Sequence, residues 1–441
     1  MKTIAIICEL NPLHNGHAYL INEAKKSFGA DRVILIMSGD FTQRGTPAIV
    51  PKEVRTKMAL TAGADVVIEL PVCYATGSAE YFAFGAISIC NTLNCVDAIL
   101  FGSECGNIKL LQQIAHILSS ENILFSEELQ KAMKAGKNFA AARDIALRKV
   151  LSVSNELDLV KDLEISPSVL ISPNNILGIE YCKSLIQTHS KIQPLTTKRL
   201  GAAYHDSLPN DPKTSDNSIN NNSSFFASAT GIRELLENSH RQGEKAEDFL
   251  SKETLLLLQN SMPPEVFKQL VSEKEYRTMN DFSMLLRYKL TCLSDRNLLT
   301  GFFDVHTDLA DKIIKNLPNF TNIDSFSLLL KSKDLTYTRI SRCLLHILLD
   351  IYEKDMKTLK EHNYPSYIRL LGFRKESSDV LSVMKKSSFS PIISRMSDAN
   401  HILDEEHKFI LHLDIKASDI YHLLDKEKEP LNEYQKKIII F

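Results

Sequence analysis

The first hundred residues alternate short apolar runs with segments of helical periodicity, and this alternation restricts the possible folds more than any other feature of the chain. We predict strands at 3–8, 31–37, 64–70 and 96–101, and helices at 16–28, 52–62 and 79–92. The strand-like runs are apolar throughout rather than at every second position, which is typical of a parallel sheet covered by helices on both faces. The sequence therefore predicts an α/β fold assembled from βαβ units.

Beyond this region the pattern changes. Residues 108–163 have helical periodicity without strong strands, and the α/β pattern resumes with a helix at 175–187 and a strand at 191–196. Residues 206–222 contain only two aliphatic side chains, Leu208 and Ile219. Such a segment buries too little apolar surface to offset its ordering entropy, so we predict a mobile surface loop.

A chain of 441 residues has room for two or three domains. A helix is expected at 225–237, and the remainder is rich in Leu, Lys and Glu at helical spacing. We predict an α/β domain over residues 1–240, which includes the helical excursion, and a mostly α-helical C-terminal domain over residues 245–441.

The composition excludes disordered and fibrous proteins, because hydrophobic residues make up 44% of the chain. The charge is nearly balanced, with 52 Lys and Arg against 54 Asp and Glu, so binding of a polyanion requires a local basic patch. No apolar run approaches the ~18 residues of a membrane-spanning helix, and no signal peptide is expected. None of the eight cysteines has CxxC spacing, which favours reduced thiols in the cytoplasm over a zinc site or disulfides.

The densest chemical signal is the segment 11–17, NPLHNGH, between the first predicted strand and the first predicted helix. Backbone N–H groups at a helix start attract anions, and His14 and His17 can both reach a phosphate chain placed there. Gly16 would let the backbone approach a ligand closely. The alternative is that both histidines only cap or pack against the helix, but a pair at the carboxyl end of a first parallel strand favours binding.

NPLHNGH resembles the HxGH signature of the adenylyltransferase superfamily, whose sheet is Rossmann-like, whereas a GxGxxG motif is absent. The resemblance implies a nucleotidyltransferase domain in which His14 and His17 hold the phosphates of ATP and stabilise transfer at the α-phosphate. A second superfamily signature, of the form SSTxxR, resembles SATGIR at 228–233. Here Ser228, Thr230 and Arg233 would bind phosphate oxygens. A plain helix cap is the alternative, and Ala229 replaces the usual second serine.

Further segments narrow the resemblance to the tRNA(Met) cytidine acetate ligase family. They include MSGDFTQRGTPAIVPKEVRTKMAL, GADVVIELP, ILFGSE, SPNNILGIEY and YTRISRCLLHIL. The family implies that acetate and ATP form acetyl-adenylate, and that the acetyl group passes to N4 of the wobble cytidine of elongator tRNA(Met). No protein nucleophile is needed, so catalysis would be positioning and charge stabilisation.

Carried over by position, the family's nucleotide contacts fall on one continuous segment and on several isolated residues. The segment comprises Ile7, Cys8, Glu9, Leu10, Asn11, Pro12, Leu13, His14, Asn15, Gly16, His17, Ala18, Tyr19 and Leu20. The isolated residues are Gly102, Asn174 and Arg199, with Asn175 as the alternative to Asn174. From local sequence alone, the asparagines could instead cap a helix, Gly102 could be a turn glycine and Arg199 a surface charge.

One pair of residues near the predicted sheet edge extends the site. Gln43 and Arg44 could face acetate or the incoming base, or lie in an exposed loop.

We expect no protein-bound metal, because no HExxH or paired-cysteine spacing occurs, and Mg²⁺ would arrive on the ATP phosphates.

The clearest candidate for RNA contact is the basic stretch 331–342, in which Lys331, Lys333, Tyr337, Arg339 and Arg342 are the predicted contacts. A solvated helix face is the alternative. A second basic candidate comprises Lys52, Arg55 and Lys57.

Two other functions remain open. The chain could transfer adenylyl groups to a small nucleotide-type acceptor, although a long helical domain with a basic stretch is not needed for that. It could also be a non-enzymatic, ATP-regulated RNA-binding protein that keeps the fold, since a fold alone does not determine function.

Overall fold

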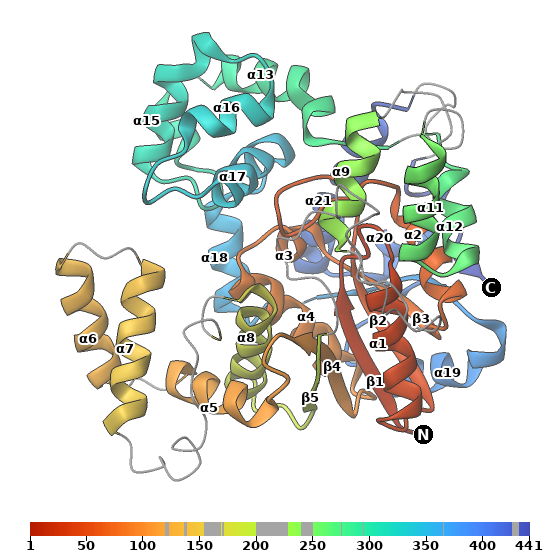
Figure 1. Cartoon of the computed structure of the whole chain (residues 1–441). Coiled ribbons are helices and arrows are strands. Elements are labelled where there is room, and N and C mark those ends of the chain that lie inside the picture. Colours follow the sequence, from red (N-terminus) through yellow and green to blue (C-terminus); the bar gives the residue numbers. More distant parts are fainter. Residues whose placement is uncertain are drawn as a thin grey trace.

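A single mixed sheet organises the computed structural model, with helices on both of its faces (Figure 1). The structure describes residues 1–119, 123–135, 139–153, 169, 172–199, 228–239, 250–274, 276–293, 295–364, 366–425 and 432–441. The strand order is β5–β4–β1–β2–β3–β6–β7, and β8 pairs with β6. The strands are β1 (Thr3–Cys8), β2 (Arg32–Ser38), β3 (Val66–Leu70), β4 (Ala98–Ser103), β5 (Gln193–Lys198), β6 (Ile368–Phe373), β7 (Ile392–Ile393) and β8 (Ile439–Ile440).

The first five strands are parallel, which confirms the predicted α/β class. Strand β1 lies between β2 and β4, so the chain winds outward from β1 in one direction and then in the other. In open α/β sheets, ligands bind at the carboxyl ends of the strands beside such a reversal. The fold therefore places the segment after β1 at the position where a ligand is expected.

Both faces of the parallel strands are buried, as their apolar runs predicted. Ile4 and Leu35 pack on one face with α1 (Asn15–Lys26) and α2 (Lys52–Thr61), whereas Ala5 and Ile34 pack on the other with α4 (Ala79–Leu93) and α8 (Pro173–Gln187). Helix α3 (Val72–Ala75) leads into α4. Each face thus has its own hydrophobic cluster.

The predicted helical excursion contains α5 (Ile108–Ser119), α6 (Ile123–Lys134) and α7 (Phe139–Val153) in its described part. Helix α5 packs on α8, and α6 and α7 pack on each other. The predicted loop at 206–222 lies outside the described residues. The helix expected at 225–237 is α9 (Ala229–Ser239).

Beyond residue 245 the described chain is mostly helical but also completes the sheet. Its longer helices are α11 (Lys252–Ser261), α12 (Pro264–Val271), α13 (Ser283–Cys292), α15 (Thr307–Asn316), α16 (Ile323–Leu330), α17 (Tyr337–Leu349), α18 (Glu353–Glu361), α19 (Ser378–Ser387), α20 (Met396–Ile402) and α21 (Glu405–His422). Strand β6 pairs antiparallel with β3, so the two predicted domains share one sheet, and the boundary near residue 240 stays a prediction. Within the described residues, no helix combines the length and apolar character that crossing a bilayer requires.

A buried charge network holds the C-terminal segment against the sheet. Lys52 Nζ lies 2.8 Å from Glu69 Oε1, 3.2 Å from Glu433 Oε1 and 3.7 Å from Asp40 Oδ2. Burial alone would lower the pKa of Lys52, but these carboxylates outweigh it and raise that pKa well above its ordinary value. Lys52 is therefore a charged core residue.

The second RNA-binding candidate is wrong for two of its three residues. Lys52 is buried in this network, and Arg55 is fully buried, where its guanidinium donates to the carbonyl oxygens of Glu9, Ser38 and Gly39. Only Lys57 is exposed. Arg55 thus fixes the ends of β1 and β2, and the three residues do not form a surface patch.

Lys52→Met should lower the free energy of unfolding by about 3–5 kcal/mol, because the buried Glu69 loses its hydrogen-bonded cation. Equilibrium urea unfolding measures this loss. Lys57→Met, on the exposed side of the same helix, is the control and should change stability by no more than about 0.5 kcal/mol. Equal losses in the two variants would contradict a special role for Lys52.

Candidate active site

A cavity of about 540 Å³ opens at the carboxyl ends of β1 and β4, within the size range of small-molecule sites. Its walls come from the starts of α1, α8 and α9, the loop after β2, and α17. The predicted site residues that line it are Ile7, Cys8, Glu9, Leu10, Asn11, His14, His17, Leu20, Gln43, Arg44, Gly102, Asn174, Arg199, Ser228, Thr230, Arg233 and Arg342. The structure thus brings the two predicted helix starts to one cavity.

Six residues of the predicted nucleotide segment do not line the cavity: Pro12, Leu13, Asn15, Gly16, Ala18 and Tyr19. Leu13 is in the hydrophobic core, and the amide of Asn15 donates to the Asn260 carbonyl. A Cβ at Gly16 would lie 2.8 Å from the Cε1 atom of His14. Gly16 therefore leaves room for the His14 ring, and the predicted close approach of a ligand to its backbone stays a prediction.

His14 and His17 cap helix α1 and also face the cavity. Nδ1 of His14 accepts a hydrogen bond from Gly16 N at 3.0 Å, and Nδ1 of His17 accepts one from His14 N at 3.3 Å. In a neutral imidazole whose Nδ1 accepts, the proton is on Nε2. The capping role that stood as the alternative therefore orients both rings as Nε2–H donors. Their ring centroids are 4.0 Å apart.

Both imidazoles are held neutral. Burial, together with the charge of Arg199, lowers the pKa of His17 to about 3. Burial, His17 and the charges of Arg199 and Arg233 lower the pKa of His14 well below its ordinary value. The neutral rings present Nε2–H groups and do not add to the net charge of the cavity.

The start of α9 is tied to the loop after β1. Ser228 Oγ accepts from Gly231 N at 3.1 Å, as a helix cap does. Arg233 Nη1 donates to the Asn11 carbonyl at 2.7 Å, and both Arg233 and Arg44 donate to Thr230 Oγ1. Hydroxyl and guanidinium groups from α9 therefore share the wall that carries the histidines.

On the β4 side, a chain of hydrogen bonds connects Arg199, Asn174 and Glu104. Arg199 Nη1 donates to Asn174 Oδ1 at 3.3 Å, and Asn174 Nδ2 donates to Glu104 Oε1 at 2.7 Å. Glu104 also accepts from the backbone N–H groups of Asn174 and Asn175, so its carboxylate caps α8. Glu104 has no role predicted from the sequence. Its position just after the fourth predicted strand is visible there, but the helix start that it caps lies 70 residues away in the sequence.

The structure distinguishes the two asparagines. Asn174 lines the cavity, whereas Asn175 is buried and its Oδ1 accepts from Cys105 N at 3.2 Å. Gly102 also lines the cavity, and a Cβ there would lie 3.2 Å from Arg199 Cγ. Asn174, Gly102 and Arg199 thus form one wall, and their contact with a nucleotide stays a prediction.

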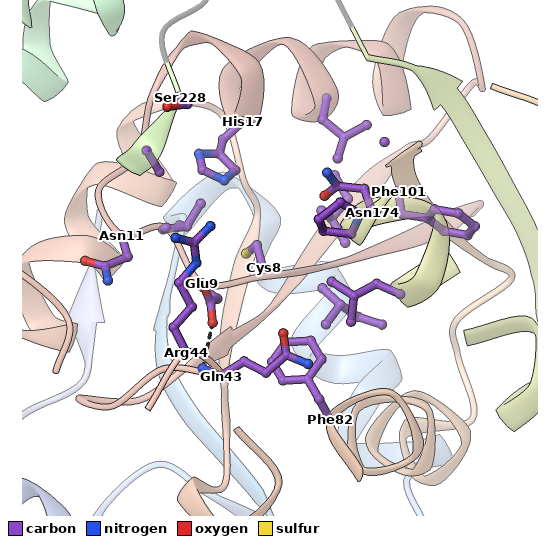
Figure 2. Close-up of a pocket in the computed structure, with 18 of the residues that line it drawn as sticks. Cys8, Glu9, Asn11, His17, Gln43, Arg44, Phe82, Phe101, Asn174 and Ser228 are labelled. Carbon is purple, nitrogen blue, oxygen red and sulfur yellow. Dashed lines mark hydrogen bonds between the residues drawn. The ribbon is translucent and has the colours of Figure 1, made fainter. Parts of the chain in front are cut away.

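The loop after β2 forms another wall (Figure 2). Gln43 N donates to Glu9 Oε1 at 2.7 Å, and the Gln43 side chain extends toward Phe82. A Cβ on Gly45, whose φ is +74°, would lie 2.3 Å from Arg342 N, so the loop packs directly on α17. Sequence reasoning missed Phe82 and Thr338 as lining residues, since they come from distant elements.

The predicted RNA patch splits into two parts. Lys331 and Lys333 are exposed. Tyr337 Oη donates to Asp324 Oδ1 at 2.7 Å, and Arg339 Nη2 lies 2.9 Å from Asp304 Oδ1. Arg342, in contrast, faces the cavity. The five residues therefore do not form one surface, and their contact with RNA stays a prediction.

The ionisable groups around the cavity leave an excess of positive charge. Arg44, Arg199, Arg233 and Arg342 contribute four positive charges, and Glu9 is the one carboxylate among the described lining residues. With neutral histidines, the sum is 4 − 1 = +3. A cavity with this charge favours a polyanion.

His17→Gln should reduce the loss of folding stability that occurs as the pH falls. In the unfolded chain this ring is protonated below about pH 6.5, whereas in the folded chain it stays neutral down to about pH 3. The stability that the neutral ring supplies is therefore complete above about pH 6.5 and is lost as the pH falls. Glutamine can keep the cap, as it does at this helix position generally. Urea unfolding at pH 7 and pH 5 should show a smaller fall for the variant than for the wild type.

His116→Gln, at an exposed position on α5, provides the control and should follow the wild type. An identical fall in the wild type and in His17→Gln would contradict the buried, neutral state of His17.

Comparison with known proteins agrees with this geometry. A family model described as HIGH Nucleotidyl Transferase matches residues 1–436. The chain is 38% identical over 441 residues to a tRNA(Met) cytidine acetate ligase of Clostridium perfringens strain ATCC 13124, covering all of both proteins. It is 38% identical over 433 residues to the protein of that name from Caldicellulosiruptor saccharolyticus, covering 97% of this chain and 95% of the relative.

A solved structure is similar over the whole length. The crystal structure of Thermotoga maritima TmcAL bound with α-thio ATP has a TM-score of 0.84 and 28% sequence identity, and the match covers 100% of this chain and 99% of that one. The full-length relative at 38% identity and the family model over residues 1–436 together assign the chain to one family. The chain belongs to the tRNA(Met) cytidine acetate ligase family of HIGH nucleotidyltransferases.

Proposed function

We propose that this protein is an ATP-dependent ligase that acetylates N4 of the wobble cytidine of elongator tRNA(Met), with acetyl-adenylate as the intermediate. The observation that carries the proposal is the convergence of two helix starts and four arginines on one cavity with a net charge of +3. ATP and acetate are both anions, so this charge suits both substrates. The names of the full-length relatives supply the acceptor.

In the first step, a carboxylate oxygen of acetate forms a bond to the α-phosphorus of ATP. The bond from that phosphorus to the bridging oxygen breaks, and pyrophosphate leaves with the electron pair. The Nε2–H groups of His14 and His17 would donate to the phosphate oxygens, where negative charge is concentrated in the transition state. Ser228, Thr230 and Arg233 would hold the departing pyrophosphate.

In the second step, the cytidine amine attacks the acetyl carbon, AMP leaves and the amine loses a proton. A covalent acetyl-enzyme is not needed, and the cavity supports this view. Cys8 is the one thiol among the described lining residues, and burial raises its pKa to about 12. The thiol stays protonated at neutral pH and is a poor nucleophile.

Mg²⁺ would enter with ATP and neutralise phosphate charge. Glu9 is the one lining carboxylate in the described residues, and its Oε1 already accepts from Gln43 N. This poor set of oxygen ligands suits a metal that is held mainly by phosphates and water.

All eight cysteines are free thiols, which fits the reducing cytoplasm.

Helix α17 offers a route for the tRNA. Lys331 and Lys333 lie exposed just before its start, while Thr338 and Arg342 line the cavity. A tRNA backbone held at these lysines would lie just before the helix that lines the cavity, where an unstacked cytidine would enter. Unstacking is cheapest for a base in a single-stranded anticodon loop.

Purified protein with ATP should transfer labelled acetate to elongator tRNA(Met), and replacement of the wobble cytidine by uridine should abolish the incorporation. Mass spectrometry of the tRNA locates the acetyl group. Transfer of AMP to a mononucleotide without use of acetate would instead support a small-acceptor adenylyltransferase. Binding of ATP and tRNA with no turnover of either would support a non-enzymatic protein.

A further inference from the structure

Arg342 comes from the C-terminal helical region, yet its side chain faces the reaction cavity. It lines the cavity with Thr338, which is one helical turn earlier in α17. The side chain is only 15% exposed, and its Nε atom is buried without a hydrogen-bond partner among the described residues. A buried guanidinium with an unused donor is costly unless a ligand completes it.

The ion pair of Arg342 is weak because its carboxylate is shared. Asp304 Oδ1 lies 2.9 Å from Arg339 Nη2, whereas Asp304 Oδ2 lies 3.8 Å from Arg342 Nη2. Burial lowers the pKa of Arg342 despite Asp304, so the carboxylate does not fully compensate for the loss of solvent. One carboxylate between two arginines leaves one positive charge unbalanced, and Arg342 is the arginine on the cavity side.

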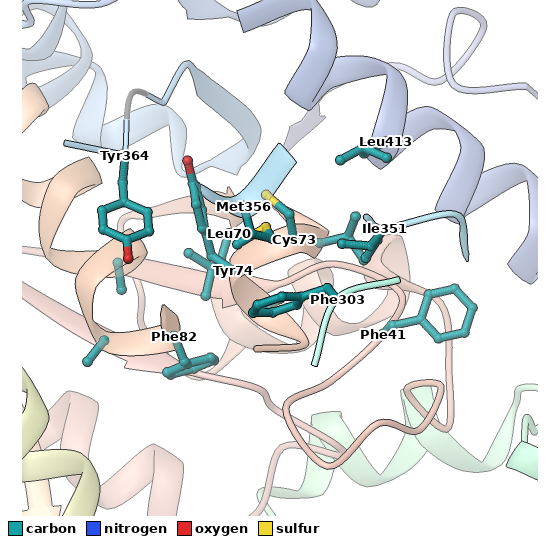
Figure 3. Packing of buried hydrophobic residues seen from close by; sticks show 14 of the residues in the cluster. Phe41, Leu70, Cys73, Tyr74, Phe82, Phe303, Ile351, Met356, Tyr364 and Leu413 are labelled. Atoms are coloured by element: carbon teal, nitrogen blue, oxygen red, sulfur yellow. The ribbon is translucent and has the colours of Figure 1, made fainter. Parts of the chain in front are cut away.

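Arg342 is also held rigidly. Ser341 Oγ donates to the Gly45 carbonyl at 3.0 Å, which joins α17 to the loop that carries Gln43 and Arg44. Ile340, Leu344 and Ile347 of α17 belong to the main hydrophobic cluster, part of which Figure 3 shows. The backbone that carries Arg342 is therefore fixed relative to this loop before a ligand binds.

The two anionic substrates need different partners. The starts of α1 and α9 together with Arg233 form one group of phosphate donors, and Arg199 lies with Asn174 on the β4 side. Arg342 comes from α17, whose backbone packs on Gly45 of the loop that carries Gln43. The Gln43 side chain extends toward Phe82, which adds apolar surface to the same cavity. A guanidinium beside apolar surface matches a small carboxylate with a methyl group, and guanidinium groups bind carboxylates in a bidentate manner.

We propose that Arg342 binds the carboxylate of acetate and orients one of its oxygens toward the α-phosphorus of ATP. The inference rests on the proposed function and names the residue that would recognise the second substrate. The geometry explains why the helical region must be docked on the sheet for the first step. No proton moves in that step, so Arg342 acts by charge and position alone.

Steady-state kinetics of the complete reaction, with acetate, ATP and tRNA varied in turn, tests the proposal. Arg342→Gln should raise the KM for acetate about tenfold or more, since it removes a charged hydrogen-bond donor, and should leave the KM for ATP within about twofold. Arg342→Lys keeps the charge but not the fork, and should raise the acetate KM less. Circular dichroism verifies that each variant is folded.

Arg296→Gln is the matched control, because it removes an exposed guanidinium of the same helical region that pairs with Asp311 and does not line the cavity, and it should leave the acetate KM unchanged. The proposal is overturned if Arg342→Gln leaves the acetate KM unchanged, or raises only the KM for ATP or for tRNA. If Arg342→Gln does not fold, the proposal is overturned by an acetate KM that stays unchanged in Arg342→Lys. A wild type that incorporates no acetate contradicts the proposed function itself, which is a separate outcome.

Discussion

Uncompensated positive charge at one end of a parallel sheet is the constraint from which the site follows. The first N–H groups of a helix have no partner within that helix, and the starts of α1 and α9 face the same cavity. Arginines add to this field, while burial keeps His14 and His17 neutral. A folded chain tolerates such an excess when a bound anion completes it, so under the proposed function one positively charged cavity would serve both ATP and acetate.

The loop after β2 links this field to the rest of the molecule. Arg277 N donates to the Ile49 carbonyl, Tyr421 Oη donates to the Ala48 carbonyl, and Gly45 packs on α17. The same loop begins at Asp40, which belongs to the Lys52 network together with Glu433. Parts of the chain from both ends therefore hold one wall of the cavity, and the helical region contributes Thr338 and Arg342 to its lining.

Local patterns were sufficient to predict β1 to β4, the histidine pair and the start of α9. In each of these, the signal lies within a few residues, such as the position of His14 directly after an apolar run. Pairings between distant segments were not predictable. The apolar run of β6 cannot be distinguished from a helix turn without β3 beside it. Likewise, Lys52 and Arg342 look like surface charges until Glu433 and the cavity are known.

The most direct measurement is a crystal structure of this protein with a non-hydrolysable ATP analogue and acetate. Our account predicts the triphosphate between the histidines of α1 and the Ser228–Arg233 turn, with the α-phosphate within hydrogen-bond distance of the imidazole Nε2 atoms. A nucleotide bound outside this cavity, or with its phosphates turned away from both helix starts, would contradict it.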